Sequence, residues 1–152
     1  MALITSRIPW RFRLGLFTAL AVAWCSGVCF FVLSRWFAIE GEFGPEKHPW
    51  QQPALMIHGA AAFFMMVGYG ALLFAHAPLA WRLRRLRVLG LCLVSAIGLQ
   101  MLTGYLLYYL ANEELRGLVG NTHAAIGFSL PFLLASHVII GNRTRVSRLP
   151  GI

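Results

Sequence analysis

Four of the five histidines in this chain lie inside long apolar segments, where ionisable side chains are uncommon. His58 and His76 belong to one such segment, and His123 and His137 belong to another. Burying an imidazole costs free energy, so it is retained where it has a function or a hydrogen-bond partner. Neutral imidazole is also a common ligand for transition metals, iron included. These four side chains are therefore the first candidates for a cofactor site.

The spacing of the histidines places each pair on one face of a helix. From His58 to His76 is 18 residues, which is five turns of 3.6 residues. From His123 to His137 is 14 residues, about 40° short of four turns. Both intervals therefore point the two rings of a pair in similar directions.

The histidines lie in two of four apolar blocks that make up most of the chain. Hydrophobic residues are 59% of the sequence and charged residues 12%, against roughly 25% charged residues in an ordinary soluble domain. Each block approaches the ~20 residues that a helix needs to cross ~30 Å of hydrocarbon. We predict an all-α integral membrane protein, a single domain over residues 1–152. Its helices are expected at about 14–37, 53–77, 88–111 and 122–141, the last of them capped by Asn121-Thr122.

The charges predict how these helices cross the membrane. Basic residues gather in the N-terminal segment, the second connection and the C-terminal segment, whereas all five acids lie in the first and third connections. Short basic segments stay on the cytoplasmic side, which predicts that both termini are cytoplasmic. Short connections favour an up-down-up-down four-helix bundle. The basic residues that give the net charge of +8 are therefore expected to set the topology and to contact anionic membrane lipid. Nucleic-acid binding is not expected.

This orientation makes the second and fourth helices parallel, so it pairs the histidines by depth. His58 is expected near His123 toward the outside, and His76 toward His137 near the inside. Two facing pairs, one in each leaflet, suit two bis-histidine b-type haems, since neutral imidazole ligates haem iron. The pairs differ in length, ~27 Å on the second helix against ~21 Å on the fourth. That mismatch requires helix tilt or oblique haems, and it makes the outer pair the surer one.

Alternative roles for these and other residues stay open at this stage. A single buried histidine can simply bond to a neighbouring backbone or hydroxyl group, and a metal site without haem would gather its ligands at one depth. Six glycines of the predicted helices could admit a flat macrocycle, although small residues also mediate plain helix packing (Gly27, Gly68, Gly70, Gly98, Gly104 and Gly127). Arg116 could pair with a haem propionate, but an interfacial anchor is favoured. His48 is expected to be a solvated loop residue. All three cysteines lie within predicted helices (Cys25, Cys29 and Cys92). Cys25 and Cys29, which share a helix face, are expected to be small buried residues rather than ligands.

On these residues the chain resembles the four-helix di-haem membrane cytochromes b, which serve respiratory dehydrogenases and other quinone-linked complexes. The interval His123-x13-His137 matches the ligand spacing common in such proteins, and the interval of 18 residues on the second helix departs from it. The resemblance implies two haem b groups, or at least one, held by His58, His123, His76 and His137. It also implies electron transfer between the membrane quinone pool and another redox protein.

The expected function is therefore that of an electron-transfer subunit of a quinone oxidoreductase complex in a bacterial inner membrane. The outer connections are the longer and more acidic, which predicts a periplasmic partner subunit such as a cytochrome c or an iron–sulfur protein. Three alternatives remain. The chain could be a non-redox scaffold or assembly subunit whose histidines are structural, a single-haem cytochrome that uses only His58 and His123, or an enzyme acting alone on a small reductant.

Overall fold

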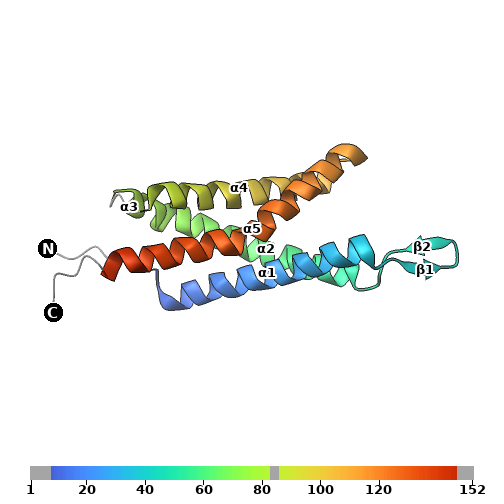
Figure 1. Cartoon of the computed structure of the whole chain (residues 1–152), viewed down its shortest axis with the longest axis horizontal. Coiled ribbons are helices and arrows are strands. Elements are labelled where there is room, and N and C mark those ends of the chain that lie inside the picture. Colours follow the sequence, from blue (N-terminus) through green and yellow to red (C-terminus); the bar gives the residue numbers. More distant parts are fainter. Residues whose placement is uncertain (1–7, 83–85, 147–152) are drawn as a thin grey trace. The chain divides into compact units, whose positions relative to one another are not determined.

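The computed structural model describes residues 8–82 and 86–146, which form a mainly helical protein (Figure 1). Its elements are α1 (Trp10–Trp36), β1 (Ile39–Gly41), β2 (Gly44–Glu46), α2 (Gln51–Ala75), α3 (Ala77–Arg82), α4 (Arg87–Tyr109) and α5 (Glu113–Val146). Helices α1, α2, α4 and α5 are long and apolar enough to cross a membrane. The prediction of a helical chain with four helices of membrane-spanning length is confirmed.

The described residues divide into two compact units, 8–70 and 71–146 without 83–85, and we describe each by itself. The division falls within α2, so each unit contains one pair of long helices or parts of them. A single domain, one four-helix bundle and cytoplasmic termini concern the two units together, and these three stay predictions.

In the first unit, α1 and the first part of α2 run antiparallel. Gln51, at the start of α2, donates a hydrogen bond from Nε2 to the carbonyl of Leu33 near the end of α1, at 3.1 Å. Further along α2, Gly68 lies against Leu16 near the start of α1, and a Cβ at Gly68 would stand 3.2 Å from Leu16 Cδ2. The start of α2 thus lies beside the end of α1, and a later part of α2 lies beside the start of α1. This antiparallel arrangement is expected for helices joined by a short connection.

The connection between α1 and α2 contains a small β-hairpin that sequence analysis did not predict. Strands β1 and β2 are antiparallel, with Ile39 opposite Glu46 and Gly41 opposite Gly44. Gly44 has φ +118, a conformation that L side chains rarely adopt. The two glycines that flank the turn were the available signal, because a residue with positive φ is typical of tight hairpin turns.

In the second unit, α4 and α5 form an antiparallel pair joined by a tight turn. Asn112 caps α5, since its Oδ1 accepts the N–H of Leu115 at 2.9 Å, and two acids in the first turn suit the helix dipole. Arg116 donates from its guanidinium to the carbonyl of Leu107 at 2.7 Å and to that of Leu110 at 3.3 Å. These bonds satisfy the last carbonyls of α4, so Arg116 closes the turn between the helices.

The start of the last helix therefore differs from the prediction. Helix α5 begins at Glu113 rather than near residue 122, and Asn121-Thr122 lies inside it instead of capping it. Helix α5 also contains Pro131, which lacks the N–H that would bond to the carbonyl of Gly127. The helix continues across the proline but bends, as Figure 1 shows between its orange and red parts.

Arginine and tryptophan interact where α3 gives way to α4. The guanidinium of Arg87 donates to the carbonyl of Trp81 at 2.9 and 3.0 Å and lies over the indole ring, 4.8 Å from its centroid. Such a cation–π pair suits the membrane–water interface. Arg84 and Arg85, which contribute to the predicted cytoplasmic charge, lie outside the described residues.

Apart from Leu130, small residues form the few buried positions of the spanning helices within the described part of the chain, and large apolar side chains cover their outside. Ala23, Ala54 and Ala61 are buried, as are Ser26 and Thr103. This is typical of helices that pack closely in a membrane and expose apolar side chains to lipid. The expectation that Cys25 and Cys29 are buried was wrong, because both are exposed, as is Cys92.

Replacing Asn112 by alanine tests the helix cap. The substitution removes the acceptor for the N–H of Leu115, and we expect it to lower the free energy of unfolding by about 1 kcal/mol. Unfolding in detergent followed by far-UV circular dichroism measures the change. Asn142→Ala, an exposed asparagine late in the same helix, is the matched control. Equal stability of the two variants would contradict the capping role.

Candidate functional site

His58 is held by a hydrogen bond to the backbone of the neighbouring helix. Its Nδ1 lies 2.8 Å from the carbonyl oxygen of Ala23 on α1. A carbonyl oxygen can only accept, so Nδ1 carries the proton and donates it. In the neutral ring, Nε2 then holds the lone pair.

His123 is oriented in the same way, by a hydroxyl group instead of a carbonyl. Its Nδ1 lies 3.0 Å from Oγ1 of Thr103 on α4. Thr103 donates its own proton along α4, to the carbonyl of Leu99 at 2.7 Å. The hydroxyl must therefore accept from His123, which again places the ring proton on Nδ1.

The second nitrogen of His123 has a partner as well. Nε2 of Gln100 on α4 lies 3.0 Å from Nε2 of His123. An amide nitrogen can only donate, so this bond requires a lone pair on the ring nitrogen. The two bonds to His123 thus agree on one tautomer, with the proton on Nδ1 and the lone pair on Nε2.

Metal-ligating histidines show this same arrangement. One ring nitrogen donates to a carbonyl, carboxylate or hydroxyl group, which fixes the tautomer and ring orientation, and the other nitrogen binds the metal. His58 and His123 meet the first condition within their own units.

Three of the four histidine rings lie against a glycine of a helix that carries no histidine. A Cβ at Gly27 would stand 2.9 Å from Cε1 and Nδ1 of His58, and one at Gly104 would stand 3.2 Å from Cε1 of His123. A Cβ at Gly90 would stand 3.7 Å from Cε1 of His137. The space at Gly27 and Gly104 therefore accommodates the imidazoles themselves, a use that sequence analysis did not consider beside macrocycle approach and helix packing.

His76 and His137 lie close enough for their rings to interact electrostatically. His76 follows the last residue of α2 and precedes α3, so it lies just beyond the helix in which it was predicted. Nδ1 of His137 is buried and makes no hydrogen bond within the described part of the chain. The structure thus brings these two side chains together without fixing the tautomer of His137. The pairing of His58 with His123 joins the two units and stays a prediction.

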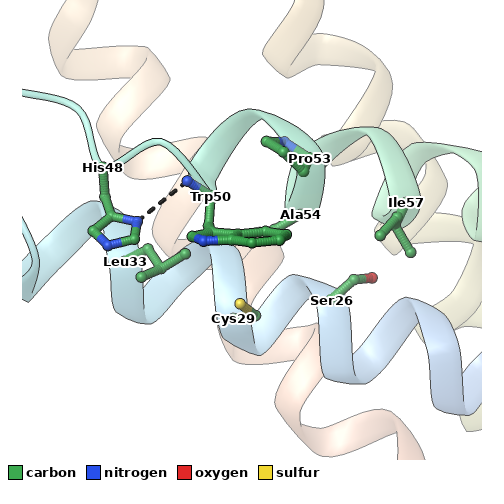
Figure 2. Close-up of a pocket in the computed structure, with 8 residues that line it drawn as sticks. All are labelled: Ser26, Cys29, Leu33, His48, Trp50, Pro53, Ala54 and Ile57. Carbon is green, nitrogen blue, oxygen red and sulfur yellow. Dashed lines mark hydrogen bonds between the residues drawn. The ribbon is translucent and has the colours of Figure 1, made fainter.

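His48 lines a pocket of about 280 Å³ where the end of α1 meets the start of α2, together with Ser26, Cys29, Leu33, Trp50, Pro53, Ala54 and Ile57 (Figure 2). Its Nδ1 accepts the N–H of Trp50 at 3.2 Å, so its proton is on Nε2, the opposite tautomer to that of His58. Ala54 of the pocket precedes His58 by one helical turn. His48 is half-buried and lies in the connection between β2 and α2, as expected for a loop residue.

Sequence analysis missed Gln100 and Thr103. Both are polar residues in an apolar helix, and that was the available signal. Their contact with His123 depends on how α4 and α5 align, which composition does not reveal.

Among the described residues, no three histidine, cysteine or acidic side chains gather at one place to hold a metal ion. No protein-family model, curated protein or solved structure matches the chain.

Gly27→Ala tests whether the glycine makes room for His58. The added Cβ would force the ring to move and weaken its bond to Ala23, so we expect a lower melting temperature in detergent. This loss opposes the gain of about 1 kcal/mol that alanine usually brings to a helix interior. Gly15→Ala on the same helix is the matched control, because no atom beyond its own stretch of helix lies within 4 Å of the added Cβ. If both variants are equally stabilised, the ring does not depend on Gly27.

Proposed function

We propose that this chain is a b-type cytochrome subunit of a bacterial inner membrane. It transfers electrons between the quinone pool and a periplasmic redox partner, such as a cytochrome c or an iron–sulfur protein. In this proposal His58 and His123 ligate one haem b, and His76 and His137 ligate a second. The chain acts as the electron-transfer subunit of a quinone oxidoreductase complex.

The observation that carries the proposal is the shared tautomer of His58 and His123. Each donates Nδ1–H to an acceptor on the adjacent helix, at 2.8 Å to Ala23 and at 3.0 Å to Thr103. Each therefore presents its lone pair on Nε2, the nitrogen that haem proteins use most readily. Bound haem b would supply an iron that takes up and releases single electrons.

Charged side chains are scarce on helices α2 and α4, which suits this role. Helix α2 contains no acid, lysine or arginine, and α4 contains none after Arg87, its first residue. Only a neutral ring has a lone pair for a metal, and the hydrogen bonds of His58 and His123 place that lone pair on Nε2. Ala23 and Thr103 orient the rings, and a donated Nδ1–H makes an imidazole a stronger ligand.

The inner pair supports a second haem less directly. The electrostatic interaction between His76 and His137 is compatible with both rings ligating one haem. However, no hydrogen bond within the described residues orients His137. This difference favours the single-haem cytochrome, with His58 and His123 alone, as the second candidate. A non-redox scaffold, in which the same hydrogen bonds only join helices, is the third.

The charge distribution supports the orientation and the partner. Three glutamates lie on or between the strands of the hairpin and are exposed (Glu40, Glu42 and Glu46). An acidic outer surface is complementary to a basic patch on a partner, which speeds association of redox proteins. Basic residues at the opposite ends of the helices would lie at the anionic cytoplasmic leaflet.

Cysteine labelling tests the orientation. In a variant with the three native cysteines replaced by serine, we introduce Glu42→Cys or Arg143→Cys, both at exposed positions. A membrane-impermeant maleimide should label the first in intact spheroplasts and the second only after permeabilisation, because the hairpin is periplasmic and the C-terminal end cytoplasmic. Labelling of position 143 in intact spheroplasts would contradict the orientation.

The visible spectrum of the purified protein tests haem binding. We expect a Soret band with an α-band on reduction, and one or two haems per chain. His58→Ala and His123→Ala should each remove the same haem, whereas His48→Ala should leave the haem content unchanged. A protein that stays colourless when produced with adequate haem supply would refute the proposed function and favour the scaffold.

A further inference from the structure

The amide of Gln100 bonds to the nitrogen of His123 that the proposed function assigns to iron. The two Nε2 atoms lie 3.0 Å apart, with the amide donating. The oxygen Oε1 of Gln100 is buried and accepts no hydrogen bond from the described residues. The amide is therefore held to its surroundings through one polar contact, while its other polar atom is unsatisfied.

The position of Gln100 depends on space provided by α5. Gly127 lies four residues after His123, one turn further along the same face. A Cβ at Gly127 would stand 2.9 Å from Nε2 and 3.7 Å from Cδ of Gln100. A glycine is thus the residue that lets this amide lie over α5 and reach His123.

We propose that Gln100 is a displaceable partner of His123, which occupies the Nε2 lone pair in haem-free protein and must release it when haem binds. This inference rests on the proposed function. One lone pair cannot accept an N–H and ligate a metal at the same time. Because its oxygen accepts no hydrogen bond from the described residues, the amide gives up one hydrogen bond when it releases His123.

The two partners of His123 then affect haem binding in opposite directions. Gln100 stabilises only the haem-free state, so its removal strengthens haem binding. Thr103 orients the ring in both states and bonds more strongly to a ligated imidazole, so its removal weakens haem binding. A purely structural role for both residues would instead shift haem binding the same way, or leave it unchanged.

Haem titration of haem-free protein in lipid nanodiscs tests this pair of effects, with the Soret absorbance as the readout. We expect Gln100→Leu to bind haem roughly threefold to tenfold more tightly than the wild type, the equivalent of one neutral hydrogen bond. Thr103→Val should bind about tenfold less tightly. Gln51→Leu is the matched control, because it breaks a bond between helices that involves no histidine, and its affinity should equal that of the wild type.

The outcomes separate this inference from the proposed function. If the wild type binds haem and Gln100→Leu binds it equally or more weakly, only the inference that Gln100 is a displaceable partner is overturned. Failure of the wild type to bind haem overturns both. Gln100→Met, which also lacks the donor, repeats the test if the leucine variant loses helical structure by circular dichroism.

Discussion

A polar side chain inside a membrane must find its hydrogen-bond partners within the protein, and the candidate site depends on this constraint. Hydrocarbon offers no donor or acceptor, so each imidazole takes the partner that the adjacent helix supplies. For His58 that partner is the carbonyl of Ala23, and for His123 it is the hydroxyl of Thr103. Both choices place the proton on Nδ1. The chemistry of the rings is thereby determined before any cofactor binds.

The two helix pairs meet this constraint in the same way. In each, a helix with histidines packs against a helix without them, which contributes an acceptor and a glycine. On α1 these are Ala23 and Gly27, and on α4 they are Thr103 and Gly104. The acceptor fixes the ring proton, and the glycine lets the ring come close to the backbone. Helices α1 and α4, which contain no histidine, thus orient the candidate ligands.

The spanning helices could be predicted from the sequence because hydrocarbon thickness imposes a length and composition that are visible in one chain. The start of α5 could not, since the charged residues after Asn112 resemble a loop and Asn121-Thr122 is an equally good cap. The exposure of Cys25 depends on which face of α1 meets α2, and the contact of Gln100 with His123 depends on how α4 and α5 align. Such alignments follow from packing of the whole pair. The candidate ligands were therefore predictable, and the residues that orient them were not.

The candidate site depends on His58 and His123 both carrying their proton on Nδ1 in the haem-free protein. Nitrogen NMR of haem-free protein labelled with ¹⁵N-histidine measures this directly, with signals assigned by comparison with His58→Gln and His123→Gln. For both residues we predict a protonated Nδ1 and an unprotonated Nε2. A proton on Nε2 of either ring would contradict this tautomer.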